Sequence, residues 1–117
     1  MSNSIVAEKS KQFAIRIINL YKYLCSAKSE YILSKQILRS GTSIGANIHE
    51  ALNAQSKNDF ISKMSIALKE AGETEYWLEL LHKTDYITDS EYNSILADCA
   101  EINKMLISIV KTSKKPS

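Results

Sequence analysis

The chain has 117 residues, 44% of them hydrophobic and 24% charged, and a formal net charge of +2. A chain of this size and composition is typical of one globular domain with a real core, which excludes the disordered class. Only three glycines and one proline occur, and the proline, Pro116, stands next to the end of the sequence. Long helices can therefore run without interruption, and the composition predicts an all-α fold.

Charge is unevenly distributed although its sum is small. Residues 1–58 contain eight basic residues against three acidic ones, whereas residues 59–117 contain seven against ten. This division is typical of a one-sided basic surface or, more often, of charge pairing between neighbouring helices or subunits. A net charge of +2 does not by itself indicate a nucleic-acid partner.

Neither a membrane-spanning segment nor an export signal is predicted from the sequence. No apolar run approaches the roughly 20 residues that a membrane-spanning helix needs. The first residues show no charged segment followed by an apolar one, so no signal peptide is predicted and we expect a cytoplasmic protein. Cys25 and Cys99 lie far apart inside apolar helical patterns, which favours buried free thiols over a disulfide.

The first two predicted helices cover residues 4–27 and 29–54. The first has the apolar stripe Val6, Phe13, Ile17, Leu20 and Leu24. The second presents one face made of Ile37, Gly41, Ile44, Ile48 and Leu52. Gly41 and Gly45 lie four residues apart on this inward side, and the missing Cβ atoms allow another helix to approach closely. Each glycine costs roughly 1 kcal/mol of helix propensity relative to alanine.

The third and fourth predicted helices cover residues 57–86 and 89–112. Ser56 and Asp59 form an approximate capping box at the start of the third, and Thr88 and Glu91 form a better one before the fourth. The fourth has the most regular apolar repeat, Tyr92, Ile95, Cys99, Ile102, Leu106 and Ile109.

Short connections make consecutive helices turn back on one another. We therefore predict a single domain, an antiparallel up-down-up-down four-helix bundle with helices crossing at about 20°. The tail, residues 113–117, is expected to fray.

The residue pattern supports no enzyme. Glu79 and His82 form one Glu-x-x-His pair, but a di-iron bundle needs two such pairs and further glutamates. Two histidines and two separated cysteines do not have the spacing of a zinc site. Because Cys25 and Cys99 occupy core-like positions, they are expected to be inert. We expect no catalytic residue, no metal and no cofactor.

Asn47, Glu50 and Glu73 form a candidate polar cluster on adjacent helices. It is interpreted either as an acidic binding cleft or as a satisfied network that sets helix register or a subunit contact. The second interpretation is favoured, because neither a nucleophile nor a metal ligand completes the set.

Two further surfaces are candidates for binding. A polar stripe on the first helix continues towards the second helix and contains the basic residues Lys9, Arg16, Lys22 and Arg39. Such a stripe can follow a phosphate backbone, although it is more often a solvated face. Tyr76 and Trp77 lie partly outside the core line of the third helix and suggest a second apolar surface.

Specific motifs in the sequence resemble a known bacterial family. They are S-I-x-x-N-I-x-E, from Ser43 to Glu50, and E-T-x-Y-W-L, from Glu73 to Leu78. Over nearly the whole chain the sequence resembles the four-helix-bundle family of proteins encoded in intervening sequences of 23S rRNA genes. Accessory proteins of diversity-generating retroelements are related to it. Ala51 departs from the pattern, since many members have glycine there.

The resemblance implies a ring-like homo-oligomer, a pentamer, and no established catalytic activity. By this resemblance, the signature positions of the family correspond to Ser43, Asn47, Glu50 and Glu73. They are signature positions and do not imply an active site. We therefore expect a non-enzymatic, homo-oligomeric structural or RNA-associated binding protein. If RNA binds, phosphate contacts are expected from Lys9, Arg16, Lys22 and Arg39. The alternative is a protein-interaction adaptor that uses the surface around Tyr76 and Trp77.

Overall fold

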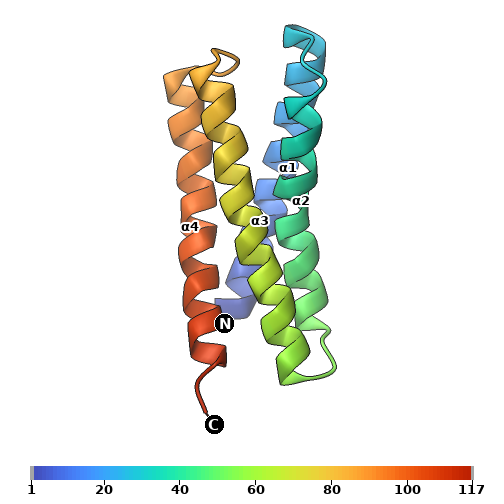
Figure 1. The fold of residues 1–117 in the computed structure, drawn as a ribbon, viewed down its shortest axis with the longest axis vertical. Helices are drawn as coiled ribbons and strands as arrows, with labels where there is room; N and C mark the ends of the chain where they lie inside the picture. Colours follow the sequence, from blue (N-terminus) through green and yellow to red (C-terminus); the bar gives the residue numbers. More distant parts are fainter. Residues whose placement is uncertain (1, 117) are drawn as a thin grey trace.

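The structure, a computed structural model, describes residues 2–116 and consists of four α-helices that run alternately up and down (Figure 1). They are α1 (Ser2–Lys28), α2 (Leu33–Leu52), α3 (Lys57–Lys83) and α4 (Asp89–Ser113). The bundle measures 50 × 22 × 20 Å. The predicted all-α, antiparallel up-down bundle is confirmed. None of the helices described is both long and apolar enough to cross a membrane.

The α1–α2 connection is longer than predicted, because α2 begins at Leu33 and not at residue 29. Ser29 has a φ of 52°, in the left-handed region that ends a helix. The N–H of Glu30 donates to the carbonyl of Leu24 at 3.0 Å, which closes the last turn of α1. These two residues terminate α1 and delay the start of α2.

The carboxylate of Glu30 caps the start of α2. It accepts hydrogen bonds from the backbone N–H groups of Ile32, Leu33 and Ser34 at 3.2, 3.0 and 2.7 Å. Three of the donors that a helix start leaves unpaired are satisfied by one side chain. Glu30 itself is buried, with 8% of its surface exposed.

The other two helix starts use the predicted caps. The Ser56 hydroxyl accepts from the N–H of Asp59 at 3.1 Å, without the reciprocal bond of a full box. Thr88 and Glu91 form the complete capping box, with bonds of 3.1 and 2.8 Å. Because these caps act within a few residues of sequence, their pattern alone sets where α3 and α4 begin.

One continuous core runs along the bundle axis. Its largest fully buried apolar side chains come from all four helices and include Ile17, Leu24, Ile37, Ile44, Ile48, Met64, Leu78, Leu81, Ile102 and Leu106. The predicted stripes of the first and fourth helices are mostly buried, with Leu20 and Tyr92 at the margin. Leu52 was predicted inside but is 44% exposed, because α2 ends there and Ala51 fills the inward position.

Gly41 and Gly45 allow α1 and α2 to approach closely, as predicted. A Cβ atom on Gly41 would lie 2.8 Å from two side-chain carbons of Ile17. On Gly45 it would lie 3.3 Å from the hydroxyl oxygen of Ser10. The propensity lost at the glycines is thus compensated by helix packing.

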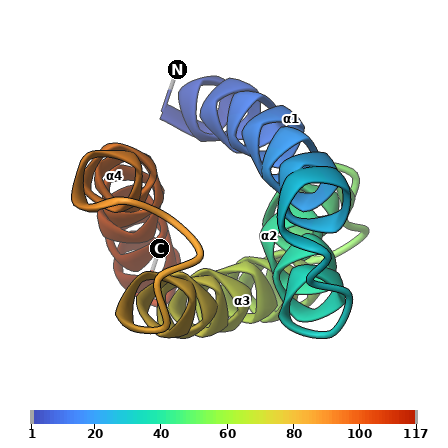
Figure 2. The same ribbon diagram turned by 90° about the horizontal axis from the view of Figure 1, so that it is seen from above.

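The contact between α1 and α4 is the least extensive of the four between neighbouring helices. Figure 2 shows these two helices on either side of the open part of the end-on view. Lys9 pairs with Glu101 at 3.1 Å, and Arg16 pairs with Asp98 at 2.7 Å. Arg16 also donates to the hydroxyl of Ser94 at 2.7 Å. Two ion pairs and a hydrogen bond therefore connect α1 and α4 at the surface, outside the buried core. We call this contact the α1–α4 seam.

Candidate functional surfaces

The four basic residues predicted to contact phosphate do not share one surface. Lys9 and Arg16 lie at the α1–α4 seam, where each is paired with a carboxylate. Lys22 is exposed on a different face of α1. Arg39 lies on α2, and its guanidinium is 4.0 Å from the carboxylate of Glu70 on α3. The stripe that seemed to face solvent thus partly faces α4, which sequence periodicity cannot reveal.

The signature residues form no buried network. Ser43 and Asn47 hydrogen-bond to carbonyl groups of their own helix at 2.6 and 2.8 Å. Glu50 is exposed and pairs with Lys63 of α3 at 3.1 Å. Glu73 is half-buried on α3. The structure therefore does not bring Asn47, Glu50 and Glu73 together as the predicted cluster.

A different polar pair links α2 and α3 in the interior. The hydroxyl of Thr74 donates to the hydroxyl of Ser40 at 3.0 Å, and both residues are fully buried. Thr74 also contacts the carbonyl of Glu70 at 2.8 Å. Sequence reasoning placed Thr74 in the core repeat but did not identify Ser40 as its partner. This pair, and not the signature residues, makes a buried hydrogen bond between α2 and α3.

Tyr76 and Trp77 stand next to each other at the edge of the α3 surface. Their rings meet edge to face with centroids 5.1 Å apart. Tyr76 is 54% exposed, whereas Trp77 is half-buried and packs against the core. The indole N–H of Trp77 is buried without a hydrogen-bond partner among the described residues. Of the two, Tyr76 is the side chain that a partner can reach.

His82, the histidine of the Glu-x-x-His pair, contacts residues at the start of α4. His82 is 2.6 Å from the carboxylate of Asp89 and stacks on Tyr92, with ring centroids 4.2 Å apart. These contacts tie the end of α3 to the start of α4. Within residues 2–116, no group of three or more histidine, cysteine, aspartate or glutamate side chains is placed to hold a metal ion.

The two cysteines are free thiols in different environments. Cys25 is half-buried and lies 3.8 Å from the hydroxyl of Ser34. Cys99 is buried, and burial, with smaller contributions from the negative charges of Glu75 and Asp98, raises its pKa to about 12. The thiol of Cys99 therefore stays neutral at physiological pH and is a poor nucleophile.

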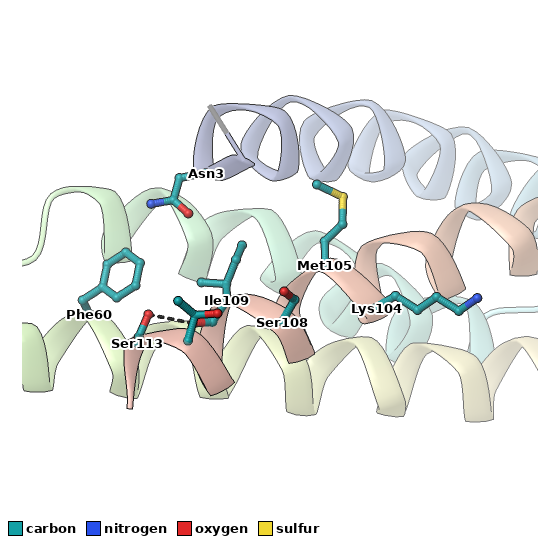
Figure 3. Close-up of a pocket in the computed structure, with 8 residues that line it drawn as sticks. Asn3, Phe60, Lys104, Met105, Ser108, Ile109 and Ser113 are labelled. Atoms are coloured by element: carbon teal, nitrogen blue, oxygen red, sulfur yellow. Dashed lines mark hydrogen bonds between the residues drawn. The ribbon is translucent and has the colours of Figure 1, made fainter. Parts of the chain in front are cut away.

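Two cavities of the bundle surface were not expected from the sequence. One, of about 560 Å³, lies between the start of α1 and the end of α4, with Phe60, Met105 and Ile109 on its apolar side (Figure 3). The other, of about 650 Å³, is a groove between α1 and α2. Its lining includes Ala14 and Gly45. Small residues recur at helical spacing in both helices and leave space between them, so this second cavity could have been predicted from the sequence.

The arrangement described above defines an antiparallel four-helix bundle with charged and apolar outward surfaces. The chain belongs to the 23S rRNA-intervening sequence protein family, whose family model matches residues 2–108. A crystal structure from Bacteroides thetaiotaomicron VPI-5482, described as a protein with unknown function from the S23 ribosomal protein family, is 63% identical in sequence. The TM-score is 0.94, with 95% of this chain and 99% of that chain covered. No curated protein sequence matches the chain.

Proposed function

We propose that the protein is a non-enzymatic, homo-oligomeric helical bundle that serves as a structural or binding module. The supporting observation is the number of large apolar side chains left outside a core that is already filled. Among the described residues the most exposed are Ile32 at 75%, Tyr31 at 55% and Tyr76 at 54%, followed by Ile107 at 49% and Ile15 at 48%. Contiguous exposed apolar patches mark protein-contact sites, and contact between copies would remove these side chains from water.

Light scattering coupled to size-exclusion chromatography tests self-assembly directly. The proposal expects one defined oligomer whose mass is a whole multiple of the 13.2 kDa chain over a wide range of protein concentration. A pentamer is the size implied by the family resemblance. A monomer at every concentration would refute the proposal.

RNA association is a second candidate. The observation that favours it is a set of exposed lysines on α1 and α2 that make no ion pair with another described residue: Lys11, Lys22, Lys28 and Lys35. Phosphate contacts of this kind release counterions, so binding weakens steeply with salt. Absorbance ratios of protein purified in low and high salt would detect bound nucleic acid.

RNA association can be tested by replacing the basic residues that were predicted from the sequence to contact phosphate. Alanine at Arg16 and Arg39 should flatten the salt dependence of binding if those side chains contact phosphate. Arg16 and Arg39 are paired with Asp98 and Glu70, whereas Lys22 makes no ion pair with another described residue, so the salt dependence of a Lys22→Ala variant is measured beside theirs. An unchanged slope in the Arg16 and Arg39 variant would remove them from the RNA surface.

A protein-interaction adaptor is the third candidate, and exposed Tyr76 favours it. Because Trp77 also packs against the core, a charge there would disturb the fold as well as the surface. Tyr76→Glu is therefore the cleaner variant. The adaptor hypothesis expects this variant to lose a protein partner while keeping its helical content, oligomer mass and nucleic-acid retention.

A further inference from the structure

The two most exposed aromatic side chains among the described residues lie in different charge surroundings. Tyr31, in the α1–α2 connection, is 55% exposed, and Tyr76 on α3 is 54% exposed. Residues 72–80, around Tyr76, contain three glutamates and no basic residue. Residues 27–35, around Tyr31, contain two lysines and one glutamate. The two rings therefore offer a similar area to a ligand, but only Tyr31 offers it beside positive charge.

The single acidic residue beside Tyr31 does not present its charge to solvent. Glu30 is buried, and its carboxylate accepts the three backbone hydrogen bonds at the start of α2. Residues 9–49 contain seven lysine and arginine residues, and Glu30 is their one acidic residue. In residues 57–113, by contrast, six lysines are mixed with ten acidic residues. A polyanion that approaches the hairpin of Tyr31 thus meets no exposed carboxylate between residues 9 and 49.

Two exposed lysines lie near Tyr31 without an ion pair to another described residue. Lys35 follows Tyr31 by four residues in the first turn of α2, and Lys22 lies in the penultimate turn of α1. Lys28 is left out, because its ammonium lies 6.0 Å from the ring centre of Tyr23 and it lines a cavity shared with carboxylates at the start of α4. We call the surface made of Tyr31, Lys22 and Lys35 the tyrosine site.

The backbone is held in place on both sides of Tyr31. The N–H of Glu30 donates to the carbonyl of Leu24 at 3.0 Å, and the N–H of Ile32 donates to the carboxylate of Glu30 at 3.2 Å. Tyr31 lies between these anchored residues at one end of the bundle (Figure 1). Because the connection is already ordered, a ligand that stacks on the ring loses little affinity to further ordering.

We infer that single-stranded RNA binds at the tyrosine site, with an unpaired base stacked on the ring of Tyr31 and neighbouring phosphates on Lys22 and Lys35. This inference rests on the proposed RNA association and specifies its site and the form of RNA. Aromatic rings bind bases by stacking, and lysines follow the phosphate backbone. In a duplex the bases are stacked on one another, so the ring can reach them only in a single strand.

Substitution of Tyr31 tests the stacking contact. Fluorescence anisotropy of a labelled oligouridylate of about 12 nucleotides, titrated with the full-length protein in low salt, measures the affinity. Tyr31→Leu should weaken binding by about tenfold or more, whereas Tyr31→Phe keeps the ring and should bind like wild type. The side chain is exposed, so the fold is expected to persist, and circular dichroism verifies this. Equal affinities of the leucine variant and wild type overturn the inference.

Two control variants separate base stacking from other contacts. Tyr76→Leu removes an equally exposed ring from acidic surroundings and should leave the RNA affinity unchanged. Ile32→Ala shortens the neighbouring side chain, which is even more exposed than Tyr31. A protein or lipid partner at this connection would depend on Ile32, but a stacked base does not. If Ile32→Ala or Tyr76→Leu weakens RNA binding as much as Tyr31→Leu, the inference is refuted.

The salt dependence of binding tests the phosphate contacts. Lys22→Ala with Lys35→Ala should reduce the slope of log affinity against log salt by about 1.4, because each phosphate contact with a single strand contributes about 0.7. Lys69→Ala with Lys83→Ala is the matched control on α3, since both lysines are exposed and neither pairs with another described residue. The control should keep the wild-type slope. Equal slopes in the two double variants contradict the assigned site.

Competition with a duplex of the same length tests the form of RNA. The single strand should displace the labelled probe at about tenfold lower concentration than the duplex. Equal competition by the duplex overturns the inference. A wild-type protein that binds neither form refutes the proposed RNA association itself. Binding that persists unchanged in the Tyr31→Leu and double-lysine variants, in contrast, refutes only the tyrosine site.

Discussion

Removing the carboxylate of Glu30 should destabilise the protein more than any other single change at a helix end. Loss of a side-chain cap typically costs about 0.5 to 2 kcal/mol. Because Glu30 accepts three hydrogen bonds, its loss is expected to cost about 1 to 2 kcal/mol of this range. The N–H of Ser34 would also be left buried without an acceptor, since Ser34 has no exposed surface. That penalty is about 1 to 3 kcal/mol. We therefore expect Glu30→Ala to lower the free energy of unfolding by about 2 to 4 kcal/mol.

Urea unfolding followed by circular dichroism, at one fixed protein concentration, measures this loss. The matched control is Glu8→Ala, because Glu8 is exposed and bonds only to Gln12 of its own helix at 3.1 Å. A change of less than about 0.5 kcal/mol is expected there. Glu30→Gln keeps an acceptor oxygen and should lie between wild type and Glu30→Ala. Equal midpoints for Glu30→Ala and Glu8→Ala would refute the capping argument.

The same cap predicts a dependence on pH. Burial raises the pKa of Glu30, but the backbone N–H groups of Leu33, Ser34 and Ile32 lower it more, so the folded pKa lies below the usual 4.5. The ionised carboxylate therefore stabilises the fold in full above the usual pKa of 4.5. This stabilisation is lost as the pH falls through the lower pKa of the folded state. The stability gap between wild type and Glu30→Ala should narrow in acid. A gap that stays constant would contradict the charge-assisted cap.

Three further predictions concern the interior. Gly41→Ala should cost about 1 to 3 kcal/mol in a thermal or urea unfolding experiment, and Gly45→Ala less, because only the first forces a methyl group to within 2.8 Å of a buried side chain. Equal costs would contradict the packing argument. Thr74→Val should cost about 1 to 2 kcal/mol, and the double variant with Ser40→Ala should cost less than the sum of the two single changes. Cys99 should react with an alkylating reagent only at the rate of unfolding, as followed by mass spectrometry, because its side chain has no exposed surface and burial also raises the pKa of the thiol.

Much of the fold follows from local sequence rules. The capping box at Thr88 and Glu91 and the three-and-four spacing of apolar residues each act within one helix, so both can be read from the sequence. The close approach at Gly41 was also predictable, since glycine on an inward helix face has few other uses. The start of α2 was not, because Glu30 caps from a position outside the usual serine, threonine, aspartate or asparagine pattern.

The candidate surfaces were harder to predict, because they depend on which helices become neighbours. The polar stripe of α1 looked solvent-exposed, yet Lys9 and Arg16 meet carboxylates that are more than 80 residues away in sequence. Asn47 was a candidate for a polar cluster with Glu50 and Glu73, yet its side chain donates to the carbonyl of Ser43 in its own helix. The exposure of Ile15 could be recognised only once the core had been filled by other side chains. Sequence periodicity gives the faces of a helix, not their partners.

Trp77 is the single tryptophan of the chain, and its position makes the protein convenient to observe by fluorescence. Its indole N–H is buried and makes no hydrogen bond within the described part of the chain, so few polar groups stabilise the excited state. Emission at short wavelength is therefore expected from the native protein, with a shift to longer wavelength when α3 separates from its neighbours. Because Tyr76 touches the indole ring, a molecule that docks on this edge would change the emission without any label being attached.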